Sequence, residues 1–215
     1  MSSSPAAAPL PAPGAWRYCP QCAGPLALLT QDEDGGPKAR LRCAACGFTH
    51  WNNPTPVLAA IVECADQGGR VLLARNAAWS GRMFALITGF MEAGETPEEG
   101  ITREVAEETA LTVDRLSLVG VYDFQRMNQV IIVYHALARG TVRLSPELVE
   151  YKLFEPADIR CWPSGTGHGV ADWLRSRGIE PRFMEWPPKA DAADTADTAG
   201  EAEPAPAPAP GAPRP

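Results

Sequence analysis

Short apolar and alternating segments divide the middle of the chain into predicted strands. Strands are expected at residues 57–63, 70–75, 84–88, 114–122, 130–138 and 149–154. The first two flank a glycine turn at residues 67–69 and predict a hairpin. In the last segment apolar and charged residues alternate, which is typical of an edge strand with one exposed face.

A helix is predicted over residues 96–111, directly after a glycine-rich stretch. Thr96 is a suitable N-cap and Pro97 suits the first helical position. Glu99 follows Thr96 by three residues, which completes a capping box. Ile101 and Val105 lie four residues apart, so both can face a core on one side of the helix.

Three carboxylates share another face of this predicted helix. Glu104, Glu107 and Glu108 have the i, i+3 and i+4 spacing, so they are neighbours and repel one another. A hard divalent cation with oxygen ligands would offset this repulsion, and Mg²⁺ would leave room for water and phosphate. A solvated acidic face is the simpler interpretation of the helix pattern taken alone.

The composition limits which partners are plausible. The chain has 215 residues, of which 45% are hydrophobic, so a buried core is feasible. Its net charge is −7, which argues against non-specific binding to nucleic acid or to an anionic membrane. A small nucleotide is still compatible with this charge, because a bound metal can offset it locally.

The longest apolar run, residues 57–62, is too short to span a membrane. The first ten residues do not resemble a signal peptide, so a cytoplasmic protein is expected.

Four of the six cysteines form two C-x2-C pairs. Their positions are Cys19, Cys22, Cys43 and Cys46. Two such pairs can supply a tetrahedral set of thiolates, and a closed four-ligand site predicts a structural Zn²⁺. A pair of disulfides or an iron–sulfur site is the alternative.

The same cysteine-rich segment also contains four basic residues, which are compatible with more than one role. The residues are Arg17, Lys38, Arg40 and Arg42. Because the set is small, a scaffolding role or the formation of a homodimer is favoured over nucleic-acid binding.

Changes in composition divide the chain into five segments. Residues 1–15 are rich in Ser, Pro and Ala and predict a disordered tail, followed by a zinc ribbon at 16–51. Residues 52–56 contain two prolines and two asparagines and predict a linker. The larger domain is expected at 57–186, and an acidic Pro/Ala-rich disordered tail at 187–215.

The spacing of glycine, arginine and glutamate residues between positions 89 and 111 resembles the Nudix box of the Nudix hydrolases. The matching residues are Gly89, Glu95, Arg103, Glu104, Val105, Glu107, Glu108 and Leu111. Ala110 departs from the pattern, because the family has glycine there. Glycine suits the left-handed conformation common after a helix, so alanine costs on the order of 1 kcal/mol or the helix ends differently.

The resemblance implies both a fold and a reaction. The fold is α/β: a Nudix α/β/α sandwich with a mixed sheet, preceded by a small zinc ribbon. The reaction is cleavage of the diphosphate linkage of a nucleoside diphosphate derivative, with release of a nucleoside monophosphate. The implied ligands of Mg²⁺ (or Mn²⁺) are Glu104, Glu107, Glu108 and the carbonyl group of Gly89.

Two roles within the box stay open. The resemblance implies that Arg103 pairs with Glu95 and fixes the loop on the helix, whereas the spacing also allows an i,i+4 pair with Glu107. The general base is a carboxylate of the box or an acid from a later loop, for which Glu147 and Glu150 are the candidates.

The substrate is less well defined than the reaction. The ribbon and the Gly-Phe-x-Glu-x-Gly-Glu sequence resemble the NADH pyrophosphatases, and the ribbon followed by Asn-Pro also resembles FAD/ADP-ribose pyrophosphatases. Residues 121–129 lack the signature that NADH pyrophosphatases carry after the box, so ADP-ribose, NADH and FAD all stay open. Tyr122 and Phe124 can stack on a base with Arg126 near a phosphate, although core packing explains them equally well. The alternative function is a nucleotide-sensing or nucleic-acid-binding regulator that uses the Nudix domain for binding only.

Overall fold

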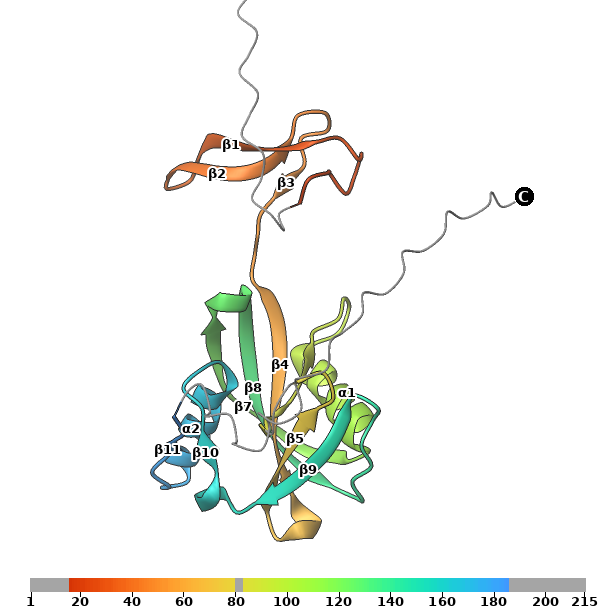
Figure 1. Ribbon diagram of the computed structural model, residues 1–215, viewed down its shortest axis with the longest axis vertical. Coiled ribbons are helices and arrows are strands. Elements are labelled where there is room, and N and C mark those ends of the chain that lie inside the picture. Colours follow the sequence, from red (N-terminus) through yellow and green to blue (C-terminus); the bar gives the residue numbers. More distant parts are fainter. Residues whose placement is uncertain (1–15, 80–82, 186–215) are drawn as a thin grey trace, which may run out of the picture. The chain divides into compact units, whose positions relative to one another are not determined.

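The computed structural model describes residues 16–79 and 83–185 (Figure 1). The chain forms two compact units, Met1–Pro54 and Thr55–Pro215, and each is described by itself. The predicted tails, residues 1–15 and 187–215, lie outside the described residues. No helix within the described ranges is long and apolar enough to cross a membrane.

The smaller unit is a three-stranded antiparallel sheet in the order β1-β2-β3. Its strands are β1 (Leu26–Glu33), β2 (Gly36–Cys43) and β3 (Thr49–His50). Among the described residues of this unit, the buried core consists of Cys19, Leu26 and Cys43, with Leu41 and Phe48 packed against it. A core this small does not stabilise a fold by itself, so the unit needs a further cross-link such as a metal.

The larger unit is built on a six-stranded mixed sheet in the order β7-β8-β4-β5-β9, with β6 also paired to β4. Its strands are β4 (Thr55–Cys64), β5 (Arg70–Asn76), β6 (Ile87–Phe90), β7 (Thr112–Phe124), β8 (Gln129–Arg139) and β9 (Leu148–Phe154). β4 runs parallel to β8 along its whole length. On its other side, the first half of β4 pairs with β6 and its end pairs with β5. β4 is therefore the central strand of the sheet, and β5, β6 and β8 all pair with it.

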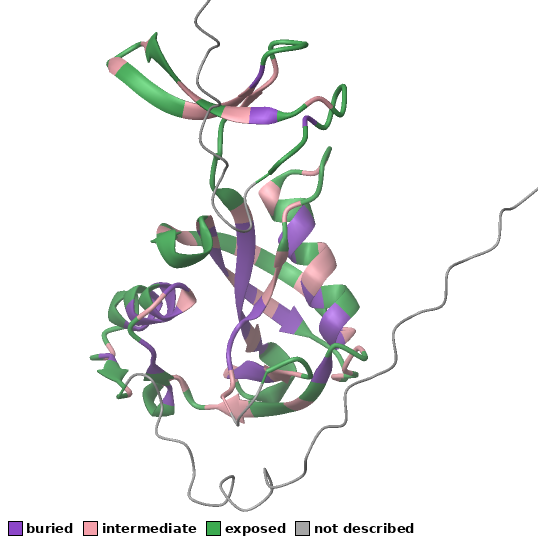
Figure 2. Ribbon diagram, turned by 45° about the horizontal axis from the view of Figure 1, so that its top comes forward, coloured by how far each residue is buried: buried purple, intermediate pink, exposed green. Residues whose placement is uncertain are grey.

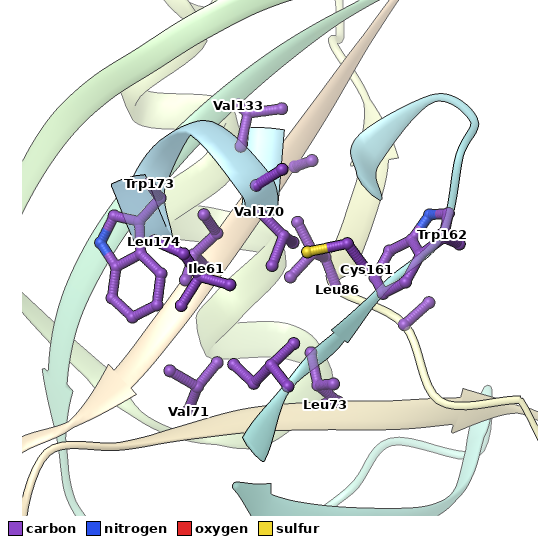
Figure 3. Close-up of a cluster of buried hydrophobic side chains, with 14 of the residues drawn as sticks. Ile61, Val71, Leu73, Leu86, Val133, Cys161, Trp162, Val170, Trp173 and Leu174 are labelled. Atoms are coloured by element: carbon purple, nitrogen blue, oxygen red, sulfur yellow. The ribbon is translucent and has the colours of Figure 1, made fainter. Parts of the chain in front are cut away.

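Two helices cover the two faces of this sheet and bury separate cores. α1 (Pro97–Thr109) packs through Ile101 and Val105 against the face that carries Leu58. α2 (Thr166–Ser176) covers the opposite face, which carries Ile61 among others (Figure 3). Side chains of a strand alternate between the two faces of the sheet, and a helix covers each face here. Almost all of β4 is therefore buried (Figure 2). The predicted α/β/α sandwich with a mixed sheet is confirmed.

Short elements complete the larger unit. They are the 3-10 helices η1 (Ala65–Gln67), η2 (Gln125–Met127) and η3 (Pro156–Asp158) and the parallel pair of β10 (Arg160–Cys161) and β11 (Arg182–Phe183). The strand expected at 84–88 begins later, at Ile87, because Ala85 makes only an isolated bridge to Ala74. Leu148–Phe154 is an edge strand, as its alternating pattern indicates.

α1 ends in the conformation that favours glycine, although the residue there is alanine. Ala110 has φ 59° and ψ 16°, and its N–H donates to the carbonyl oxygen of Ala106 at 2.9 Å. The helix thus ends in a left-handed residue, and Ala110 bears the steric cost of its Cβ. Of the two outcomes open from the sequence, the chain adopts the strained ending.

Replacing Ala110 by glycine should therefore stabilise the protein by about 1 kcal/mol, because the left-handed conformation is unhindered for glycine. Ala106→Gly, at an exposed interior position of the same helix, should instead destabilise by about 1 kcal/mol. Denaturant unfolding followed by far-UV circular dichroism measures the stability of both variants. The signal reports on the larger unit, because α1 and α2 both lie there. Equal effects of the two substitutions would contradict the proposed strain.

Candidate active site and zinc site

The glycine loop joins β6 to α1 and holds the start of the helix. The Thr96 hydroxyl accepts from the N–H of Glu99 at 3.2 Å, and a Glu99 carboxylate oxygen accepts from the N–H of Thr96 at 2.8 Å. This is the capping box that the sequence predicts. Within the loop, Glu95 accepts the N–H of Glu92 at 2.7 Å. The loop is therefore held by its own carboxylates before it reaches the helix.

Arg103 joins the loop to the helix through one guanidinium group. Its Nη2 and Nε donate to the two Glu95 oxygens at 3.0 and 3.2 Å. Its Nη1 donates to Glu104 at 3.0 Å and to Glu107 at 3.1 Å. Nη2 also lies 3.4 Å from the carbonyl oxygen of Phe90. The two pairings left open by the sequence are thus present together, and Arg103 offsets the charge of two helix glutamates.

The helix lies so close to β6 that position 89 has no room for a side chain. A Cβ on Gly89 would lie 1.9 Å from the carboxyl carbon of Glu104. Gly100 has the same function on the other side, since its Cβ would lie 2.5 Å from atoms of Glu95 and Leu58. These two glycines let α1 approach the loop and the sheet closely. The carboxylate of Glu104 consequently lies against the backbone of Gly89.

Glu108 is the most buried of the three helix glutamates, with 7% of the residue exposed. Burial, followed by the charges of Glu104, Glu147 and Glu107, raises the pKa of Glu108 to about 7. Burial also raises the pKa of Glu104, against the opposing effect of Arg103. Buried carboxylates that lack enough positive charge are costly. The donor set therefore fits a hard divalent cation, which prefers such oxygen ligands.

The glutamate oxygens have not converged on a single point, however. Within the described ranges, only the four cysteines place three or more ligand atoms of His, Cys, Asp or Glu within 4.8 Å of one another. The contacts of Arg103 explain the difference, because they hold Glu104 and Glu107 while Glu108 lies deeper. A metal ion at this site would compete with Arg103 for the two outer carboxylates.

A later loop brings a fourth carboxylate to this site. The N–H groups of Arg143 and Ser145 donate to the carbonyl oxygens of Thr109 and Glu108 at 2.9 and 3.0 Å. These bonds dock the loop on the last turn of α1 and satisfy carbonyl groups that the helix leaves free. Glu147 in this loop is close enough for its charge to raise the pKa of both Glu104 and Glu108.

Glu150, the other candidate from a later loop, lies on β9 instead. Its carboxylate is 3.5 Å from Arg75 and 3.7 Å from Lys152. It is therefore an ion-pair partner at the sheet edge, and Glu147 rather than Glu150 is among the charges that raise the pKa of Glu108.

Two of the three predicted substrate-binding residues, Tyr122 and Phe124, lie on the face opposite α1, and Arg126 lies in η2. Tyr122 and Phe124 pack against the core below α2, and the Tyr122 hydroxyl donates to Asp172 at 2.9 Å. The guanidinium of Arg126 lies 5.4 Å from the ring centroid of Phe124. The structure thus brings these residues to one another and to α2, but not to the helix glutamates.

Phe90 is a candidate that the sequence analysis missed. It follows Gly89 in β6, so its side chain points to the α2 face while residue 89 faces Glu104. Fifty-nine per cent of Phe90 is exposed. Strand pairing links it through Val57 and Ile131 to Tyr122 in one row across the sheet. Strand alternation counted from Gly89 is the signal that would have found it.

The four cysteines of the smaller unit form a closed set. The Sγ atoms of Cys19 and Cys46 are 3.5 Å apart, as are those of Cys22 and Cys43. A tetrahedral site with Zn–S bonds of about 2.3 Å has sulfur atoms about 3.8 Å apart. The turns of the two pairs use left-handed residues, Ala23 and Gly47. The geometry fits a structural Zn²⁺ held by four thiolates.

Comparison with known proteins agrees with this geometry. The family model described as "NUDIX domain" matches residues 54–174, more than half of the chain. The model of a zinc ribbon described as "Nudix N-terminal" matches residues 17–52. The chain belongs to the Nudix family. A crystal structure of a Nudix hydrolase from Nitrosomonas europaea is similar to it, with a TM-score of 0.61 and 26% identity. That similarity covers 79% of this chain and 97% of the other.

Curated relatives of this Nudix protein include enzymes named NAD-capped RNA hydrolase NudC. The one from Mycobacterium tuberculosis (strain ATCC 25618 / H37Rv) is 40% identical over 105 residues, or 47% of this chain and 34% of that protein. The one from Pseudomonas putida is 26% identical over 158 residues, or 71% of this chain and 54% of that protein. The Nudix chain thus spans between a third and just over half of the length of these relatives.

The ribbon of this Nudix protein should contain about one zinc per chain when it is purified without chelators. Cys43→Ser should lose the metal, because an open three-thiolate set binds zinc less tightly. Cys64→Ala, which removes a buried thiol of the larger unit, should keep it. Elemental analysis of the three proteins measures this, and zinc-free wild-type protein would refute the assignment.

Proposed function

We propose that this Nudix protein hydrolyses the diphosphate linkage of a nucleoside diphosphate derivative and releases a nucleoside monophosphate. The observation that carries the proposal is the carboxylate cluster around the buried Glu108, formed where α1, β6 and the docked loop meet. A cluster of like charges is unfavourable for the apo fold, so its presence favours a function that needs a cation there.

Glu104, Glu107 and Glu108 would hold Mg²⁺ or Mn²⁺, together with the carbonyl group of Gly89. When bound, such an ion neutralises diphosphate oxygens, orients them and lowers the pKa of a water molecule. Arg103 positions Glu104 and Glu107 and keeps the Glu95 loop on the helix. Gly89 leaves the space in which the Glu104 carboxylate lies.

Glu147 is our proposed general base. It is the acid from a later loop whose charge acts on Glu104 and Glu108, and the docked backbone holds its loop in place. A base must come within hydrogen-bonding reach of the proton it removes, and such bonds are often long before substrate binds. Glu150 is less suitable, because it is already paired with Arg75 and Lys152.

A dinucleotide of the NAD type is the substrate that we favour. The relatives named NAD-capped RNA hydrolase support this class, as does the resemblance of residues 89–95 to the NADH pyrophosphatases. The exposed ring of Phe90 and the ring of Tyr122 lie on the α2 face at the end of the sheet that carries Gly89. This row can receive a planar base while the diphosphate lies near α1.

Glu107→Gln and Glu108→Gln should each lower the rate of metal-dependent hydrolysis at least about a hundredfold, because each removes a charged metal ligand. The assay uses NADH, ADP-ribose, FAD and NAD-capped RNA with Mg²⁺ or Mn²⁺, and it measures release of the monophosphate. Full activity in both variants would refute the site. Nucleotide binding by the wild type without turnover of any substrate would favour the regulator instead.

Glu147→Gln should lower kcat by about 10²-fold to 10⁴-fold and leave KM nearly unchanged, as expected for loss of a general base. Glu150→Gln is the matched control on the neighbouring strand, and it should change kcat by less than about twofold, since exposed ion pairs contribute little. A larger loss in Glu150→Gln than in Glu147→Gln would reverse the assignment.

A further inference from the structure

One face of the zinc ribbon is more basic than the composition of the chain suggests. Lys38, Arg40 and Arg42 alternate along β2, so their side chains point to the same face of the small sheet. The register places them opposite Gln31, Leu29 and Ala27 of β1. Since alternate residues of a strand lie about 7 Å apart, the three cations form a row of about 14 Å.

The two arginines of this row are held by one carboxylate. Arg40 donates through Nε to both oxygens of Glu33, at 2.8 and 3.0 Å, and Arg42 also pairs with Glu33. The hydrogen bonds of Arg40, and to a lesser extent the charge of Arg42, hold the pKa of Glu33 below its usual range against the opposing effect of burial. Lys38 is exposed and makes no ion pair with any described residue. Three cations against one carboxylate leave this face with a net positive charge.

An exposed tryptophan lies beside Arg40, the middle residue of the same row. The Arg40 guanidinium is 4.9 Å from the ring centroid of Trp51, and its Nη1 donates to the Trp51 carbonyl oxygen at 3.1 Å. Fifty-four per cent of Trp51 is exposed. Arg40 therefore fixes the ring from one side by a cation–π contact and leaves much of its surface accessible.

We propose that this Trp51 face, formed by Lys38, Arg40, Arg42 and Trp51, binds single-stranded RNA. The row of cations would follow the phosphates, and Trp51 would stack on an unpaired base. An indole ring can stack on a base only when that base is unpaired and splayed out, which favours a single strand over a duplex. The proposal rests on the proposed function, because the RNA would be the chain attached to an NAD-type 5′ end. Contacts to that chain add to the affinity of the catalytic site.

The net charge of −7 had argued against nucleic-acid binding, but it sums over the whole chain. Side chains of a strand alternate between the two faces of the sheet, so the basic residues of β2 gather on one face. A polyanion that binds this face is affected by its local positive charge more than by the net charge of the chain. The opposite face offers a matched control. There Trp16 stacks on His50, with ring centroids 4.9 Å apart and planes at 16°, and no cation contacts its ring among the described residues.

Fluorescence anisotropy with a labelled single-stranded RNA of about ten nucleotides and an unmodified 5′ end tests this in the full zinc-loaded chain. Trp51→Ala should weaken binding about tenfold, whereas Trp51→Phe should keep most of it. Lys38→Glu should weaken binding and reduce its salt dependence by roughly one phosphate contact. Trp16→Ala should bind like the wild type. Zinc content and circular dichroism confirm that each variant is folded.

Trp51→Ala should hydrolyse NADH at the wild-type rate and hydrolyse NAD-capped RNA with a kcat/KM reduced about tenfold, whereas Trp16→Ala should match the wild type on both substrates. Wild-type protein that does not bind the RNA, or equal binding by Trp51→Ala and wild type, would overturn the proposal. Equal losses in Trp16→Ala and Trp51→Ala would overturn the assignment to this face. Failure of the wild type to hydrolyse any dinucleotide would instead refute the proposed function, and the anisotropy result would still decide on the RNA site.

Discussion

The close approach of α1 to β6 is the constraint on which the candidate active site depends. It brings the Glu104 carboxylate against the backbone of Gly89, at a distance that only glycine permits. Once the helix lies there, Glu108 is buried beside other carboxylates, and its pKa rises to about 7. Arg103 is the internal cation that makes this arrangement tolerable without metal, because it bonds both outer glutamates and the loop. Burial and charge are thus combined in one place, as is common at catalytic sites.

The central strand β4 explains why several distant segments meet at this point. Its first half pairs with β6, which carries Gly89, and its full length pairs with β8. Residues on one face of β4 support α1, and those on the other support α2. The end of the sheet that holds the glutamates on the α1 face therefore holds Phe90 and Tyr122 on the α2 face. The dinucleotide that we propose as substrate has two parts with different chemistry, and the two faces of the sheet differ in the same way.

Local sequence signals were sufficient where an element depends on its own residues. The capping box at Thr96, the order of the strands along the chain and the four-cysteine set all follow from spacing. They failed where distant packing decides. The late start of β6 at Ile87 depends on pairing with β4, and the exposure of Phe90 depends on which face α1 leaves uncovered. The placement of Tyr122 and Phe124 below α2 could not be read from a strand pattern that fits either face equally well.

The sequence by itself determined the chemistry that is present: a run of glutamates on one helix face, a glycine before it, an arginine able to pair in two ways, and four thiolates. These follow from residue type and spacing, since helix and turn periodicities are local. Only the tertiary structure decided how the groups are used. It showed that Arg103 makes both pairings, that Glu147 and not Glu150 lies near Glu108, and that the basic residues of β2 share a face with Trp51. Those outcomes depend on which segments pack together, and side-chain periodicity alone does not encode that.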